Sequence, residues 1–191
     1  MSTVRPGNQT TLVIVDVQVG VMAGSWDSPR VIDNVARTAA KARETGVPVI
    51  WVQHESDELP RDSAVWQLVP ELVPAANETR VFKRYPSSFE DTDLEAALAA
   101  LGTTHIVLAG AQTNWCIRAT AYAALDRGYD LTLVADAHTT GPIEMEDGSR
   151  VEAASMIADL NVATTWLQYP GRTSQNVATN ELVLAASGIG R

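Results

Sequence analysis

The chain has 191 residues, 46% of them hydrophobic, and a formal net charge of −9 at pH 7. This length and composition fit one domain with a sizeable core, and the negative charge argues against nucleic acid and anionic membranes as partners, which leaves a small molecule. The sequence has no apolar run of membrane-spanning length, no signal-peptide core near Met1, and a single cysteine that cannot form an internal disulfide. A soluble cytoplasmic protein is therefore expected.

The first predicted strand covers residues 11–17, Thr-Leu-Val-Ile-Val-Asp-Val, and is almost continuous in apolar and β-branched side chains. Such a run is typical of a parallel strand that helices cover on both faces. Asp16 interrupts it at the carboxyl end, where open α/β sheets bind ligands and where a buried carboxylate is costly without a task. We expect a functional carboxylate, with Gln18 facing the same side. The alternative is that Asp16 caps N–H groups of the following loop.

Three predicted helices each end at a glycine and lead into a new apolar strand. The units are a helix from Ser28 to Gly46 with strand 47–53, helix 94–101 with Gly102 and strand 105–109, and helix 117–127 with Gly128 and strand 131–135. This repetition is typical of βαβ units with right-handed crossovers. A helix at 151–159 and a last strand at 161–167 complete the expected core, at about 11–167. In the tail, 168–191, residues 181–186 have the pattern of one more helical turn.

Residues 54–78 lose this alternation and contain His54, Trp66 and several prolines. A run of this length is expected to be a functional loop with short helical turns. Trp66 either lines a pocket or anchors the loop. The short strand from Arg80 to Phe82 follows and ends at Lys83, which is either a solvated surface lysine or part of a site.

Cys116 follows a turn of small residues and stands at the start of the predicted helix 117–127. A thiol at a helix start meets free N–H groups and the positive end of the helix dipole, which both favour the thiolate. Cys116 is therefore a candidate nucleophile. The alternative is a buried, inert cysteine.

Asp16, Lys83 and the Cys116 turn share the carboxyl edge of the predicted sheet. A nucleophilic thiol needs a base, donors for an oxyanion and a positioned cation, and this edge offers all three. None of the histidines is well placed as the base, because they lie in a loop, at a strand start and after a strand: His54, His105 and His138. A buried carboxylate is a workable base, since burial raises its pKa.

Four segments between about Thr11 and Leu167 carry further motifs at the predicted strand ends. They are Val-Ile-Val-Asp-Val-Gln at 13–18, Phe-Lys at 82–83 with Pro-Ser-Ser-Phe at 86–89, Gly-Ala-Gln-Thr-Asn-Trp-Cys at 110–116 and Asp-Ala-His-Thr-Thr at 136–140. In order and spacing they resemble the motifs of the isochorismatase-like cysteine hydrolases. The resemblance implies one domain over residues 1–191, a three-layer α/β/α fold of Rossmann-like topology, and a six-stranded, mainly parallel sheet.

The resemblance also implies a catalytic triad of Asp16, Lys83 and Cys116. It implies a cis peptide before Gln112, which turns the Gln112 N–H toward the Cys116 N–H to form an oxyanion hole. In this mechanism Asp16 takes the thiol proton, the thiolate attacks a carbonyl, and Asp16 then protonates the leaving amine and activates a water against the thioester. Lys83 holds Asp16 ionised and oriented.

Two departures from the family pattern bear on the chemistry. Asn114 stands where the family usually has an acid, which is expected to alter local hydrogen bonding without abolishing activity. The metal cluster of the nicotinamidases, an Asp-x-His pair with a further His, is missing. His54 with its acidic neighbours Asp57, Glu58 and Asp62 is a poor transition-metal site, so neither a metal nor a cofactor is expected and nicotinamidase activity is disfavoured.

Cys116 favours hydrolysis of a C–N bond in an amide, carbamoyl or ureido compound, because the isochorismatases that break a vinyl ether lack this cysteine. Two alternatives stay open. One is vinyl-ether hydrolysis with Asp16 as a general acid, and the other is a catalytically idle binding or redox-responsive protein with the same fold.

Several side chains are candidates to line the substrate pocket, with packing as the alternative role for each. They are Gln18, Trp26, Trp66, Tyr85, Phe89, Trp115, His138 and Thr139. The resemblance further implies a homodimer or larger homo-oligomer. The apolar segment Leu-Val-Leu at 182–184 either serves such a contact or folds back on its own domain.

Overall fold

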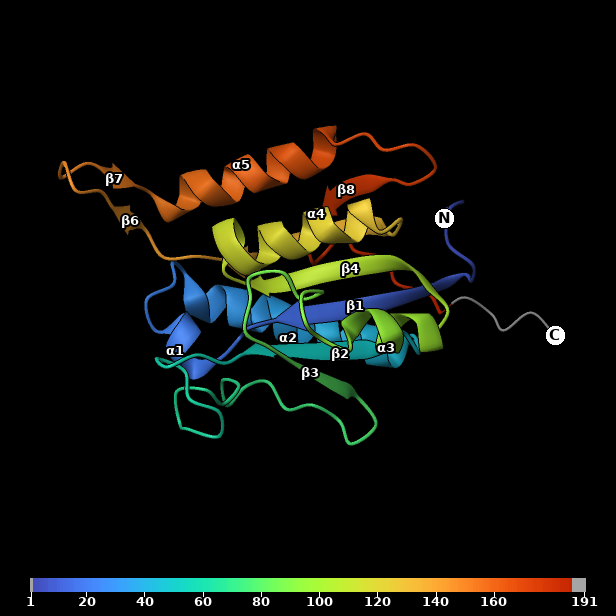
Figure 1. Cartoon of the computed structure of the whole chain (residues 1–191), viewed down its shortest axis with the longest axis horizontal. Helices are drawn as coiled ribbons and strands as arrows, with labels where there is room; N and C mark the ends of the chain where they lie inside the picture. The colour runs from blue at the N-terminus through green and yellow to red at the C-terminus, as the bar shows by residue number, and fades with distance from the viewer. Residues whose placement is uncertain (1, 187–191) are drawn as a thin grey trace.

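Six parallel strands form the central sheet of the computed structural model, which describes residues 2–186 (Figure 1). The strands stand in the order β3-β2-β1-β4-β5-β8, and every neighbouring pair is parallel. This confirms the expected α/β class and the six-stranded sheet. The bounds are β1 Gln9–Val15, β2 Val49–His54, β3 Thr79–Lys83, β4 Thr103–Ala111, β5 Asp130–Thr139 and β8 Ser174–Val177.

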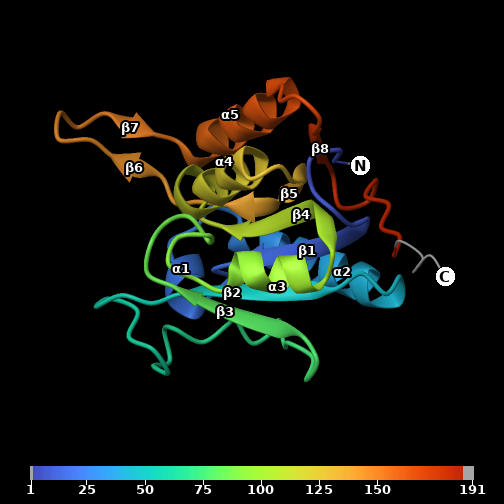
Figure 2. The same ribbon diagram turned by 45° about the vertical axis from the view of Figure 1, so that its right-hand side comes forward.

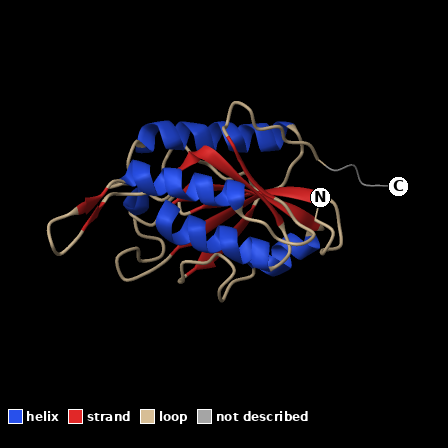
Figure 3. Cartoon of the chain, turned by 90° about the horizontal axis from the view of Figure 1, so that it is seen from above, coloured by secondary structure: helices blue, strands red, loops and turns tan. Residues whose placement is uncertain are grey.

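Helices cover both faces of the sheet and make the three layers that the sequence predicts. Figure 2 shows α3 in front of the sheet and α2 behind it, and Figure 3 shows the twisted strands among the helices from above. One face packs against α1 and α2, and the other packs against α3, α4 and α5. The bounds are α1 Val19–Met22, α2 Ser28–Glu44, α3 Leu94–Ala100, α4 Arg118–Asp126 and α5 Ala153–Trp166.

The core explains why β1 is a continuous apolar run. Leu12 and Ile14 belong to the core cluster under α2, whereas Val13 and Val15 belong to the cluster under α3 and α4. Successive side chains of a strand point to opposite faces, so both faces need apolar residues when both are covered. The helices α2, α3 and α4 also end two residues before Gly46, Gly102 and Gly128, as the helix–glycine–strand pattern predicts.

The C-terminal part differs from the sequence prediction. Residues 161–167 were expected to form the last strand, but α5 continues to Trp166 and carries Leu160 and Thr164, four residues apart, into the buried layer. The sixth strand is instead β8, which lies in the predicted tail and pairs with β5. The expected helical turn at 181–186 is also wrong. Leu182 and Leu184 pack into the chain's own core from a segment without regular secondary structure, and their separation of two residues does not match the spacing of one helical face.

A two-stranded hairpin, β6 (Ile143–Glu144) with β7 (Arg150–Val151), projects from the body of the molecule (Figures 1 and 2). It connects β5 to α5. In the described part of the chain, no helix combines the length and apolarity that a bilayer span requires.

Gly110 lets β4 approach β1 at the edge where the polar side chains gather. The pairing of β4 with β5 shifts its register between Leu108 and Gly110, and Gly110 has a φ of +124°. A Cβ on Gly110 would lie 2.0 Å from the carbonyl oxygen of Val15, the residue before Asp16. This contact requires glycine, both for the backbone conformation and for the space.

Gly110→Ala is therefore expected to destabilise the fold by about 3 kcal/mol or more, because the added methyl group overlaps the β1 backbone and the φ is strained. Denaturant unfolding followed by circular dichroism measures this. Gly24→Ala is the matched control, since a Cβ there meets no atom within 4 Å, and it should change stability by less than about 0.5 kcal/mol. Equal stability of the two variants would contradict the assignment.

Candidate active site

Asp16, Lys83 and Cys116 come from three separate strand ends and meet in space. Asp16 directly follows β1, Lys83 is the last residue of β3, and Cys116 lies in the π-helical turn η1 (Thr113–Ile117) after β4. Lys83 Nζ lies 2.7 Å from Asp16 Oδ2 and 3.1 Å from Cys116 Sγ. The chain thus places a carboxylate and a thiol next to one ammonium nitrogen, Lys83 Nζ.

Both members of the ion pair are almost completely buried, with 1% of each residue exposed. Burial alone would lower the pKa of Lys83, but the negative charge of Asp16 and the neighbouring Cys116 outweigh it and raise that pKa. Lys83 is therefore a cation at neutral pH. Its charge stabilises a carboxylate that would otherwise be costly to bury.

The thiol of Cys116 is protonated at neutral pH. Burial and then the charge of Asp16 raise its pKa to about 12, and the opposing effect of Lys83 is smaller. The expectation that a helix start favours the thiolate is therefore wrong here. The site is buried and holds a carboxylate close to the sulfur, which disfavours a second negative charge.

The turn before Cys116 has the backbone geometry that the family resemblance implies. The peptide between Ala111 and Gln112 is cis. The carbonyl oxygen of Gln112 accepts hydrogen bonds from the N–H groups of Trp115 and Ile117, both at 3.1 Å. These bonds hold the turn closed around the thiol.

His138 supports this turn from inside the protein. Asn161 donates its amide Nδ2–H to the Ala135 carbonyl, so its Oδ1 accepts from His138 Nε2 at 3.0 Å. The other ring nitrogen, Nδ1, then accepts from the Thr113 hydroxyl at 2.9 Å. Burial lowers the pKa of His138 to about 4, so the ring is neutral and both of its nitrogens are used by the protein.

Asn114 takes part in a second support. Its Oδ1 accepts a hydrogen bond from the Thr140 hydroxyl at 2.6 Å, which ties the turn to the residue after β5. An amide oxygen serves this bond as well as a carboxylate oxygen would, and it adds no further negative charge beside Cys116.

A cavity of about 650 Å³ opens onto the reactive groups. Asp16, His54, Gln112 and Cys116 line its inner end, and Trp115 lines it with a side chain that is 56% exposed. The remaining wall is mainly apolar and consists of Gly20, Val21, Ala23, Ser56, Glu58, Leu59, Val65 and Pro86. This is the volume and wall chemistry of a small-molecule site.

Among the predicted pocket residues, Trp115 lines this cavity and Gln18 does not. Gln18 has no exposed surface, and its amide is fully used by the main chain of the loop. The side-chain Nε2–H groups donate to the carbonyl oxygens of His54 and Trp66, and Oε1 accepts from the His54 N–H at 2.8 Å. Gln18 therefore fixes the loop after β2 to the end of β1.

Two further aromatic candidates, Trp66 and Phe89, are packed inside the protein. Trp66 is buried with its ring 5.6 Å from that of Phe82, and Phe89 is buried with its ring 5.9 Å from that of Tyr129. The remaining candidates lie outside the lining of the cavity as well: Trp26, Tyr85, His138 and Thr139.

The sequence interpretation placed His54 in a loop and did not count it among the site residues, but the structure places it at the site. It is the last residue of β2, it lines the cavity, and its Nδ1 lies 3.3 Å from Lys83 Nζ. Its position at the carboxyl end of a predicted strand was the available signal, because parallel strands end at the same edge. In the described residues, no three His, Cys, Asp or Glu side chains are arranged to hold a metal ion.

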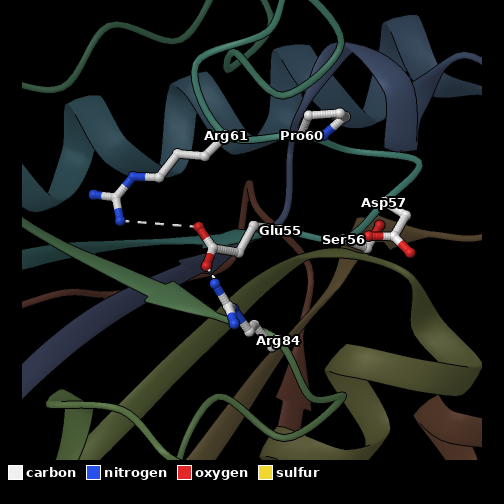
Figure 4. A pocket seen from close by; sticks show the side chains of 6 residues that line it. All are labelled: Glu55, Ser56, Asp57, Pro60, Arg61 and Arg84. Atoms are coloured by element: carbon white, nitrogen blue, oxygen red, sulfur yellow. Dashed lines mark hydrogen bonds and ion pairs between the residues drawn. The ribbon is translucent and has the colours of Figure 1, made fainter.

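A second, open cavity of about 730 Å³ borders the first at Ser56 (Figure 4). Figure 4 shows Glu55 between two arginines, with Arg84 Nε 2.7 Å and Arg61 Nη1 3.9 Å from its carboxylate. The Arg61 guanidinium also lies 3.9 Å from the centre of the Phe82 ring. These contacts brace the loop that follows His54 and so help to shape one wall of the reactive cavity.

The high thiol pKa predicts slow, strongly pH-dependent alkylation of Cys116. With a pKa of about 12, the rate with iodoacetamide should rise about tenfold per pH unit from pH 7 to 9 without a plateau. Asp16→Asn should react faster than the wild type at pH 8, because the charge that raises the thiol pKa is gone. Labelling is specific, since the chain has one cysteine, and Cys116→Ala is the blank. A plateau below pH 9 would contradict the assignment.

Comparison with known proteins places the chain in a family. Residues 10–165 match the model of the isochorismatase domain. A streptothricin hydrolase of Streptomyces noursei is 33% identical over 135 residues, 68% of this chain and 49% of that protein, so the match spans about half of that relative. The ureidoacrylate amidohydrolase RutB of Methylobacterium radiotolerans is 28% identical over 70% of this chain and 68% of its own length.

The fold agrees with this match. The crystal structure of an isochorismatase from Pseudomonas putida superimposes with a TM-score of 0.82 at 26% identity, and the superposition covers 93% of both chains. The family model covers most of the chain, including the ends of β1, β3 and β4 at which Asp16, Lys83 and Cys116 lie. The chain therefore belongs to the isochorismatase family of hydrolases.

Proposed function

We propose that this hydrolase cleaves a C–N bond in a small amide, carbamoyl or ureido compound through a thioester on Cys116. The observation that carries the proposal is the position of Lys83 Nζ, which contacts Asp16 at 2.7 Å and Cys116 at 3.1 Å at the inner end of the cavity. A carboxylate and a thiol on either side of one cation supply the base, the nucleophile and the charge that acyl transfer requires.

The raised thiol pKa favours proton transfer during attack over a thiolate formed in advance. The charge of Asp16 acts on the thiol of Cys116, and both residues line the cavity. As Sγ forms its bond to the substrate carbonyl carbon, the thiol proton passes to Asp16, and Lys83 stabilises the negative charge that develops on sulfur. Proton transfer and carbon–sulfur bond formation then take place in the same step.

The N–H groups of Gln112 and Cys116 are the proposed donors for the tetrahedral oxyanion. Both residues line the cavity beside the sulfur. When the tetrahedral intermediate collapses, the C–N bond breaks and the leaving nitrogen takes the proton from Asp16. A water then attacks the thioester with Asp16 as its base, which releases the acid and restores the thiol.

The names of two relatives support this class of substrate. One is called a streptothricin hydrolase and the other a ureidoacrylate amidohydrolase, and both names denote hydrolysis of small molecules. The cavity of about 650 Å³ and its apolar wall suit a ligand of that size. The substrate proposed here is accordingly a small C–N compound with an apolar portion that contacts Val21, Val65 and Trp115.

Cys116→Ala is expected to lower kcat by at least about 10³-fold on such a substrate, because no covalent intermediate can form. A screen of amides, ureas and carbamates that follows ammonia or amine release identifies the substrate and measures the loss. Circular dichroism and the unfolding midpoint verify that the variant is folded. A folded variant that keeps the wild-type rate would disprove the thioester mechanism.

The same variant separates the proposal from vinyl-ether hydrolysis. If isochorismate were the substrate with Asp16 as a general acid, Cys116→Ala would keep its activity on isochorismate, and Asp16→Asn would lose it. We expect no isochorismate turnover by the wild type above the rate of a sample that contains Asp16→Asn.

A further inference from the structure

Lys83 has more acceptors around it than hydrogens to donate. Its ammonium group carries three N–H donors and no acceptor. Within hydrogen-bond range of Nζ lie Asp16 Oδ2 at 2.7 Å, Cys116 Sγ at 3.1 Å, the Tyr85 carbonyl at 3.2 Å and His54 Nδ1 at 3.3 Å. While the thiol is protonated, its sulfur is the weakest of these acceptors. The ammonium group donates to the Tyr85 carbonyl oxygen, to His54 Nδ1 and to the sulfur, and its charge is paired with the Asp16 carboxylate.

This contact determines the tautomer of His54. An ammonium group can only donate, so Nδ1 of the ring must accept and carries no proton. A neutral imidazole then has its proton on Nε2. The structure gives Nε2 no hydrogen-bond partner among the described residues, and it leaves the ring partly exposed at the wall of the reactive cavity.

The main chain at His54 is held rigidly. Gln18 bonds both its carbonyl oxygen, at 3.0 Å, and its N–H, at 2.8 Å. Because Gln18 directly follows the Asp16-Val17 strand end, the same segment fixes the base and the imidazole relative to each other. A ring that is placed with this accuracy beside the reacting groups is suited to a specific contact.

We propose that His54 acts in the site as a neutral Nε2–H imidazole, with Nδ1 accepting from Lys83 and Nε2–H donating to an acceptor atom of the substrate. The inference rests on the proposed function and names a further group in it. Through Nδ1, His54 is a positioning residue that keeps the ammonium between Asp16 and Cys116. Through Nε2, it selects substrates that carry a carbonyl or carboxylate oxygen next to the scissile bond.

The charges around the ring favour the neutral form. Burial lowers the pKa of His54 below its usual 6.5, Lys83 lowers it further, and the opposing effects of Asp16 and Glu55 are smaller. Glu58 lines the same cavity, and Arg84 is paired with Glu55. Protonation would place two cations 3.3 Å apart and remove the acceptor for Lys83. Activity is therefore lost as the pH falls through the lowered pKa of His54.

Three substitutions at His54 test the roles of Nδ1 and Nε2 separately. The side-chain oxygen of His54→Asn stands near Nδ1 and can accept from Lys83, the amide of His54→Gln reaches the place of Nε2, and His54→Leu supplies neither. We expect His54→Leu to lower kcat about tenfold or more and to raise KM about tenfold. His54→Asn should recover most of the lost kcat but should keep the raised KM. It should also abolish the loss of activity at low pH that protonation of His54 causes in the wild type. His54→Gln should recover KM but not kcat.

Several results would overturn the inference. A His54→Leu enzyme with wild-type kcat and KM would do so, and so would a His54→Asn enzyme that is no better in kcat than His54→Leu. Asp57→Asn is the control for a change on the same loop. Asp57 is exposed, and it lines the second cavity of about 730 Å³ but not the cavity that contains His54 and Cys116. Loss of all activity in Cys116→Ala with normal behaviour of the His54 variants would leave the proposed function intact and remove His54 from it.

A measurement without substrate tests the same point independently of the proposed function. Nitrogen-15 NMR of the imidazole rings distinguishes the two tautomers, and His54→Asn assigns the His54 signal among the three histidines. We expect the Nε2–H tautomer and a pKa below 6.5 that rises in Lys83→Met, because the neighbouring cation is removed. An Nδ1–H tautomer in the wild type would overturn the inference.

Discussion

The buried ion pair between Asp16 and Lys83 is the interaction on which the rest of the site depends. Removing two charges from water is costly, and the attraction at 2.7 Å offsets that cost only while both partners stay in place. The sheet holds the two side chains in place, since β1 and β3 end at the same edge with β2 between them. The other polar groups of the site contact the ammonium group of this pair: the sulfur of Cys116, the ring of His54 and the carbonyl oxygen of Tyr85.

The same pair explains why Cys116 is held as a thiol. A carboxylate beside a buried sulfur raises the sulfur's pKa, and the ammonium only partly opposes it. In the proposed mechanism the proton leaves as the carbon–sulfur bond forms, so the base has to lie near the thiol from the start. The close approach of β4 to β1 at Gly110 makes this proximity possible, because a side chain there would push the Cys116 turn away from the end of β1.

Polar residues near the site divide into those that face the cavity and those that hold its walls. Gln18 and His138 have strong hydrogen-bonding groups, yet each is buried and satisfied by the protein, one by the loop after β2 and the other by Thr113 and Asn161. A buried donor or acceptor without a partner is costly, so a residue that the protein itself satisfies is not free to bind a ligand. His54 differs in that the residues of the described range, 2–186, use only one of its two nitrogens.

The sequence by itself determined the α/β class, the strand–helix alternation and the strand ends at which Asp16, Lys83 and Cys116 lie, because burial on both faces imposes apolar runs and glycine ends the helices. The local sequence pattern did not predict the structure of residues 161–167, where the packing of Leu160 and Thr164 keeps β-branched residues helical. It also did not predict β8, which is short and polar. Only the tertiary structure decided which polar residues face the cavity, that the thiol is protonated and that His54 contacts Lys83. Each of these depends on distances between segments far apart in the chain, and pKa values and hydrogen bonds follow from those distances.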